Sequence, residues 1–162
     1  MATLVLFYSA TGNTRKSATA LAGALGAELC EITCSAYAKG FWGPFRKAYD
    51  VLAGRNPPVE IPEMADQVWD MIVLGSPVWG ARPAPPIRSY LQRDGRHYAR
   101  LAMFVTASGT SPKYPPGRAI EEMMTLSRLP PQHTCIFTEA QINGPDFTAA
   151  ITACADKMQP GL

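Results

Sequence analysis

Short apolar runs recur along the chain, and small or polar residues follow each of them. The first run covers residues 2–8 (ATLVLFY), and others lie at residues 28–33, 70–75, 101–108 and 134–138. Continuous apolar runs of this length are typical of strands that are buried on both faces of a sheet. The pattern therefore predicts five buried β-strands.

Between these runs, apolar residues recur with the spacing of a helix. Apolar residues recur at three- and four-residue intervals from Ala18 to Leu25, and Gly26 is placed to end that helix. Three later segments are also compatible with helices, namely residues 86–92, 119–128 and 147–158. Strands that alternate with helices predict a doubly wound parallel sheet in a three-layer α/β/α fold. At 162 residues we expect one domain, spanning residues 1–162.

Residues 36–62 interrupt this alternation. They are rich in Gly and Pro and include the aromatic residues Phe41, Trp42, Phe45 and Tyr49. We expect an elaborated connection that contains a helix near residues 44–53. Its aromatic side chains belong either to the core or to the wall of a substrate pocket.

Composition narrows the class of protein. A hydrophobic content of 47% and a charged content of 17% are those of a soluble globular chain. The formal net charge of +2 is too small to argue for nucleic-acid binding. No apolar run approaches the roughly 18 residues of a membrane span, and no signal peptide is evident, so we expect a cytoplasmic protein.

The cysteines and histidines show no metal-binding or redox spacing. There is no CxxC pair and no nearby histidine in ligand spacing, so neither a zinc site nor a redox dithiol is expected. His97 and His133 stand alone in the sequence. We expect all four cysteines to be buried, reduced thiols: Cys30, Cys34, Cys135 and Cys154.

Ligands of open parallel sheets bind outside the carboxyl ends of the strands. Three loops fall at such ends, at residues 9–14, 76–86 and 108–116. The first is rich in hydroxyl and amide side chains and precedes a helix N-terminus, which favours a phosphate. It lacks both GxxxxGK[ST] and GxGxxG, which argues against a nucleoside triphosphate or a Rossmann-type dinucleotide. A phosphate monoester fits these donors.

The flanks of this loop resemble a known signature. The pattern V-L-F-x-S-x-x-G-x-T-x-x-x-A-x-x-L, from Val5 to Leu21, is similar at every position to the phosphate loop of the flavodoxin family. The resemblance implies a flavodoxin-like five-stranded parallel sheet of order 2-1-3-4-5 and noncovalently bound FMN. It assigns six residues to the phosphate: Ser9, Ala10, Thr11, Gly12, Asn13 and Thr14.

The second loop, SPVWGARPAPP, resembles the flavodoxin loop that carries a Trp-Gly step beside the flavin. The resemblance implies that Pro77, Val78, Trp79 and Gly80 contact FMN, with the indole stacked on one ring face. Gly80 would turn its carbonyl toward flavin N5 when that atom gains a proton, a peptide flip that the family uses. The alternative for Trp79 is a core or interface aromatic.

The third loop would meet the pyrimidine edge of the flavin. Small residues allow its backbone to approach closely, and we expect Ser108, Gly109 and Thr110 to contribute there. Tyr114 is expected either to cover the other ring face or to be an ordinary surface tyrosine.

Charge sets this chain apart from typical flavodoxins, which are acidic. Residues 81–118 hold seven basic residues and one acidic residue, a local charge of +6. A basic surface around the flavin would stabilise an anionic reduced flavin and favour an acidic redox partner or an anionic small molecule. The alternative is a solvated face whose arginines pair with local acids.

Two functions follow from the resemblance. The first is an FMN-binding flavodoxin-like electron-transfer protein that acts between redox partner proteins, and no catalytic residue is expected because the three loops contain no His, Glu or Asp. The second is an FMN-dependent NAD(P)H oxidoreductase of the quinone reductase type, with Arg82 and Lys113 on the nucleotide phosphates. Whether the chain is an enzyme is left open. A third reading is a binding module without redox activity.

Overall fold

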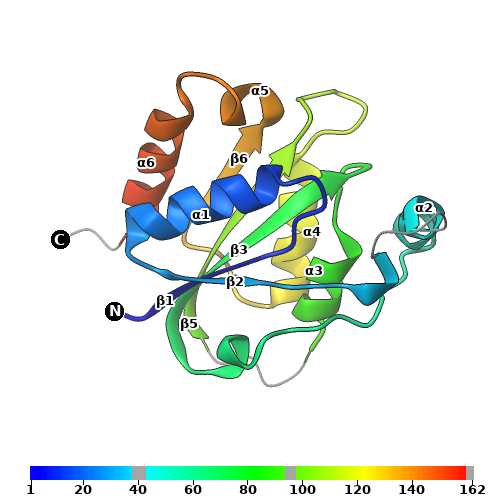
Figure 1. Ribbon diagram of the computed structural model, residues 1–162, viewed down its shortest axis with the longest axis horizontal. Coiled ribbons are helices and arrows are strands. Elements are labelled where there is room, and N and C mark those ends of the chain that lie inside the picture. The colour runs from blue at the N-terminus through cyan, green and yellow to red at the C-terminus, as the bar shows by residue number, and fades with distance from the viewer. Residues whose placement is uncertain (38–42, 94–97, 160–162) are drawn as a thin grey trace.

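The computed structural model describes residues 1–37, 43–93 and 98–159. Its centre is a sheet of five parallel strands in the order β2-β1-β3-β5-β6 (Figure 1). The order predicted from the sequence is confirmed; only the strand numbers shift, because a short fourth strand was not expected. The strands are β1 (Thr3–Phe7), β2 (Glu28–Glu31), β3 (Trp69–Trp79), β5 (Tyr98–Ala107) and β6 (Thr134–Thr138).

Helices cover both faces of the sheet (Figure 1). One face packs against α1 (Asn13–Leu25), α5 (Glu139–Ile142) and α6 (Phe147–Met158), and the other against α3 (Pro85–Leu91) and α4 (Gly117–Ser127). Successive residues of β1 serve the two faces in turn, since Val5 and Phe7 join the first core and Leu4 and Leu6 the second. Both cores need apolar side chains, so the strand reads as a continuous apolar run.

The connection between β2 and β3 carries α2 (Gly43–Ala53), flanked by the 3₁₀ turns Ser35–Tyr37 and Glu63–Asp66. The helix predicted near residues 44–53 is therefore confirmed, and it lies to one side of the sheet (Figure 1). Phe45 and Tyr49 are 63% and 55% exposed, so assigning these two aromatics to the core would be wrong. Phe41 and Trp42 lie outside the described residues.

Strand β3 extends four residues further than the sequence predicted. Residues 76–79 were expected to begin a loop, but they continue the strand. Ser76 and Pro77 pair in parallel with β5, and the last two residues pair antiparallel with β4 (Arg82–Pro83), which folds back. The register joins Val78 to Pro83 and Trp79 to Arg82. The apolar pattern does not reveal the end of this extension, because its last two residues pair with a two-residue strand that follows directly in the chain.

The expectation of four reduced thiols is wrong for two of them. Cys135 in β6 and Cys154 in α6 form a disulfide, with Cα atoms 6.3 Å apart. They are 19 residues apart in the chain and meet only because α6 packs beside β6, which no local spacing indicates. Cys30 and Cys34 are buried and free, and burial raises the pKa of the Cys30 thiol to about 11.

The described part of the chain has neither a membrane-spanning helix nor a cluster of metal-binding side chains. None of its helices combines the length and hydropathy that a membrane crossing requires. Nor do three or more of its His, Cys, Asp or Glu side chains gather closely enough to ligate a metal ion.

Candidate functional site

A cavity of about 330 Å³ lies at the carboxyl ends of four parallel strands. Residues that follow or end β1, β3 and β5 line it, as the sequence predicted for that edge of the sheet. A fourth contribution comes from the residue after β6. The lining consists of Thr11, Asn13, Pro77, Val78, Trp79, Thr106, Ala107, Ser108 and Glu139.

The β1–α1 loop forms one end of the cavity around a glycine in the left-handed region. Gly12 has φ +103° and is the N-cap of α1. The Ser9 hydroxyl accepts hydrogen bonds from the N–H groups of Gly12 and Arg15, both at 3.2 Å. No acceptor within the described residues takes the N–H groups of Asn13 and Thr14, so the first turn offers them to a ligand.

Polar side chains in and beside this loop are held by protein partners. The buried Thr14 hydroxyl hydrogen-bonds the Thr106 hydroxyl at 2.7 Å. Arg15 forms a bidentate pair with Glu31, at 3.0 and 2.7 Å, and Lys16 donates to the Ile142 carbonyl at 2.6 Å. The charge that this end presents to an anion therefore comes from backbone amides and the helix dipole.

The other end of the cavity is a tight β-hairpin turn. Gly80 and Ala81 connect Trp79 of β3 to Arg82 of β4, with φ +57° and +64°. Two central residues with positive φ define the type I′ turn that suits a two-residue hairpin. Ala81 is one of two described non-glycine residues with positive φ, and it is buried. The turn thus stores strain next to Trp79.

Trp79 lies beside aromatic side chains from two other segments. Its ring centroid is 5.9 Å from that of Tyr8, edge to face, and 6.1 Å from that of Tyr37. Burial raises the pKa of Tyr8 to about 12. Burial, and then the hydrogen bond to Asp50 at 2.7 Å, raise the pKa of Tyr37. Both phenols therefore stay neutral at ordinary pH, and their rings pack beside the indole.

The third loop enters the cavity only at its start. Ser108 lines the cavity, whereas Gly109 and Thr110 follow outside the lining. Tyr114 is 50% exposed, lies under the Lys113 ammonium at 5.3 Å and does not line the cavity. Its predicted role as a second ring cover stays a prediction.

Six of the predicted site residues line the cavity, and the other eight are not part of its lining. The six are Thr11, Asn13, Pro77, Val78, Trp79 and Ser108. The eight are Ser9, Ala10, Gly12, Thr14, Gly80, Gly109, Thr110 and Tyr114. Sequence reasoning missed Thr106, Ala107 and Glu139, although the strand-end rule applied to the apolar run at residues 134–138 would have found Glu139. Glu139 adds an acidic residue to the lining of a site whose three predicted loops contain none.

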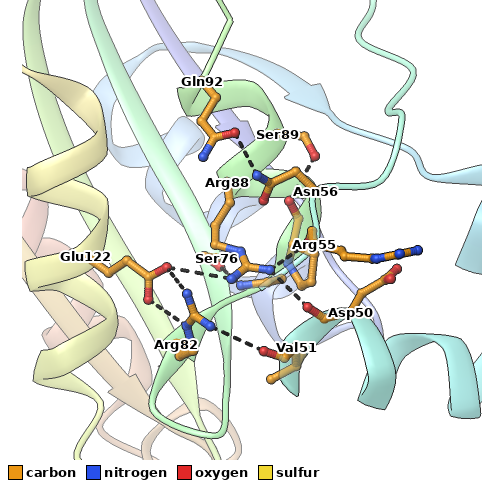
Figure 2. A network of polar contacts seen from close by, with 12 residues as sticks. Asp50, Val51, Arg55, Asn56, Ser76, Arg82, Arg88, Ser89, Gln92 and Glu122 are labelled. Atoms are coloured by element: carbon orange, nitrogen blue, oxygen red, sulfur yellow. Dashed lines mark hydrogen bonds and ion pairs between the residues drawn. The ribbon is translucent and has the colours of Figure 1, made fainter. Parts of the chain in front are cut away.

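An arginine network, of which Arg88 is buried, supports the hairpin end of the cavity (Figure 2). Arg82 forms a bidentate pair with Glu122 of α4, at 2.8 and 2.9 Å, and donates to the Val51 carbonyl at 3.3 Å. Arg88 of α3, with a side chain 2% exposed, lies 3.7 Å from the same carboxylate. Its Nη2 donates to the carbonyls of Asp50 and Arg55, at 3.2 and 2.7 Å, so it caps the end of α2.

These contacts change the interpretation of the basic segment. Arg82, expected on a nucleotide phosphate, is held by Glu122, and Arg93 pairs with Asp66 at 3.3 Å. Both acids come from outside residues 81–118, so the sequence count overstates the charge of this surface. Burial lowers the pKa of Arg88, as does Arg82, while Glu122 raises it. The guanidinium stays charged in any case.

Comparison with solved structures decides the fold. A flavoprotein from Lactobacillus acidophilus NCFM in complex with FMN aligns with TM-score 0.67 and 23% identity over 88% of this chain and 96% of that one. A putative flavoprotein from Bacteroides eggerthii DSM 20697 gives 0.70 and 20% over 97% of both chains. Oxidised Flavodoxin 2 from Bacillus cereus gives 0.56 and 17% over 98% and 97%. The fold is that of the flavodoxins.

The flavodoxin-like fold is thus shown by structure and not by sequence. No protein-family model matches the chain, and no curated protein matches it in sequence. The cavity lies where the flavodoxin resemblance placed the ligand, outside the carboxyl ends of the central strands.

Proposed function

We propose that the protein binds FMN noncovalently in this cavity and carries electrons between redox partner proteins. One observation carries the proposal: a single cavity joins a helix N-terminus that has free amides to an indole. Amides suit a phosphate, and the indole suits a flat aromatic ring. A structural neighbour, the Lactobacillus acidophilus flavoprotein, was solved in complex with FMN, which supports the choice of ligand.

Each part of FMN has suitable partners in the chain. The N–H groups of Asn13 and Thr14 would hold the phosphate, and Trp79 would pack on the ring system. The polar groups of Ser108 would be available at the ring edge. When bound, FMN supplies one- and two-electron transfer, so the protein itself needs to bind the ring and shield it from water.

The electron-carrier function suits this site better than the oxidoreductase function. Hydride transfer from NAD(P)H requires cations for the nucleotide phosphates, and the Arg82 guanidinium is already held by Glu122. Lys113 and Arg118 are exposed beside the third loop and suit the surface of an acidic redox partner.

Titration of the ligand-free protein with FMN and with riboflavin tests the proposal. The two ligands differ only in the phosphate, so quenching of flavin fluorescence measures what the helix N-terminus contributes. We expect FMN to bind about 100-fold more tightly, since hydrogen bonds to a charged group are worth about 1.5–3 kcal/mol each. Equal affinities would refute the phosphate site, and no binding of either ligand would refute the cofactor.

The oxidoreductase alternative has its own test. FMN-loaded protein is mixed anaerobically with NADH or NADPH, and the flavin absorbance is followed by stopped flow. For a carrier we expect no bleaching beyond that of free FMN. Rapid bleaching would replace the carrier proposal by the oxidoreductase.

A further inference from the structure

Helix α2 and the Trp79–Gly80 turn enclose a second cleft of about 380 Å³, next to the first cavity. Its surface is almost entirely apolar. Leu52 lies at its edge with 86% of its surface exposed, an unusual position for a leucine on an otherwise folded helix. The lining consists of Lys47, Ala48, Val51, Leu52, Trp79 and Gly80.

One cation stands in this cleft without an acidic partner. The Lys47 ammonium lies 5.9 Å from the ring centroid of Trp79 and 5.8 Å from that of Tyr37. No carboxylate among the described residues lies within 4 Å of it. The neighbouring Asp50 carboxylate is buried and bonded to the Tyr37 hydroxyl instead. The ammonium is therefore free to meet an anion.

We propose that this cleft binds a planar aromatic anion. The ring lies between the apolar side of α2 and the Trp79–Gly80 turn, where a flat apolar ligand buries the most surface. The anionic oxygen pairs with the Lys47 ammonium, and the apolar surroundings strengthen the attraction between the two charges. Ionised hydroxyquinones and aromatic carboxylates or sulfonates have this chemistry.

The site is independent of FMN but adjacent to its proposed position. Trp79 lines both cavities, so a ligand in the second contacts the indole that forms the wall of the first. One wall of the second cleft comes from α2, which the arginine network fastens to α3 and β4 (Figure 2). The cleft therefore has a fixed width, as a binding site requires.

Two fluorescent probes of nearly equal shape test the proposal. Anilinonaphthalene sulfonate is a planar aromatic anion, and N-phenyl-1-naphthylamine is its uncharged counterpart. Fluorescence titration of the folded protein gives a Kd for each. We expect Lys47→Met to weaken the sulfonate about tenfold and the neutral probe less than about twofold.

Leu52→Glu should weaken both probes at least about tenfold, because it replaces part of the apolar wall by a charged group, and for the sulfonate it also adds a like charge. Since Leu52 is exposed, this variant keeps its fold. Val68→Glu is the matched control, as Val68 is 81% exposed and lies before β3 at the other end of the sheet. Lys157→Met in α6 is the control for loss of charge. Both control variants should bind the probes as the unmodified protein does.

Three results would overturn the proposal. The first is probe binding that neither Lys47→Met nor Leu52→Glu changes. The second is displacement of the probe by saturating FMN, which would place it in the first cavity. The third is a dimer in sedimentation that Leu52→Glu dissociates, which would show that a second copy covers the cleft. If FMN itself fails to bind, the titrations still decide this proposal.

Discussion

The two ends of the first cavity are built in different ways. At the β1–α1 end, consecutive residues form the site, and local hydrogen bonds to Ser9 hold the turn. At the hairpin end, Trp79 is positioned by Tyr8, by Tyr37 and by an arginine network that joins four elements. The first end can therefore form as soon as its strand and helix meet. The second exists only when the whole chain is folded.

The two ends also differ in whether their stability depends on a buried charge. Ser9 and the helix amides keep their geometry without any buried charge. The hairpin end depends on Arg88, which is 2% exposed and whose Nε has no hydrogen-bond partner among the described residues. A buried charge is tolerated only while its partners remain, so substitutions far from the cavity should disturb the hairpin end and spare the other.

The largest expected effect is the loss of stability when the arginine network is broken. Glu122→Ala should lower the free energy of unfolding by about 3 kcal/mol, because it leaves the buried Arg88 without its carboxylate. Urea denaturation measures this change, and near-UV circular dichroism reports whether the Trp79 surroundings are altered. Glu121→Ala, an exposed neighbour on α4, is the control and should change stability by less than about 0.5 kcal/mol. Equal losses in the two variants would contradict the difference between the ends.

The next effect is on ligand binding at the hairpin end. Trp79→Ala should weaken FMN and riboflavin alike, by about 100-fold, because the ring loses its packing surface while the phosphate contacts persist. Flavin fluorescence titration measures both affinities. Tyr114→Ala is the comparison variant. It should change the affinities for FMN and riboflavin by less than about twofold, since Tyr114 lies outside the cavity lining. A loss for Tyr114→Ala as large as for Trp79→Ala would instead support a second ring cover.

A smaller effect is expected for Thr14, and it tests whether the Thr14 hydroxyl contacts the ligand. Thr14→Val and Thr106→Val should each cost about 1 kcal/mol of stability, and the double variant less than the sum, because one hydrogen bond joins them. The preference for FMN over riboflavin should change less than about threefold, since backbone amides make the phosphate contacts. Thermal unfolding and the two-ligand titration measure these quantities. A tenfold loss of the preference would mean that the Thr14 hydroxyl turns to the ligand.

The smallest effect is expected in the turn itself. Ala81→Gly should raise the free energy of unfolding by about 0.5–1 kcal/mol, because glycine adopts positive φ without strain. Ala53→Gly at the end of α2 should lower it by a similar amount, since that alanine is helical and exposed. Chemical denaturation of both variants checks the opposite signs. A destabilised Ala81→Gly variant would show that the turn is not strained.

Prediction from the sequence succeeded for features that depend only on residues close together in the chain. The continuous run around Val5 and Leu6 predicted a buried strand because both faces of the sheet require apolar side chains there. It failed where the cause lies in a partner that is distant in the chain. Arg82 looked available until Glu122 was seen to hold it, and Cys135 looked reduced until α6 brought Cys154 beside it.

By itself the sequence determined the alternation of strands and helices, the strand ends that form the site and the amide-rich first turn. Those features depend on periodicity, on turn-forming residues and on the direction of parallel strands, all of which are local. Only the tertiary structure decided that Thr14 bonds Thr106 and that α2 forms a second cleft beside Trp79. Those outcomes depend on which side chains of distant segments meet, and packing of the complete chain alone fixes that.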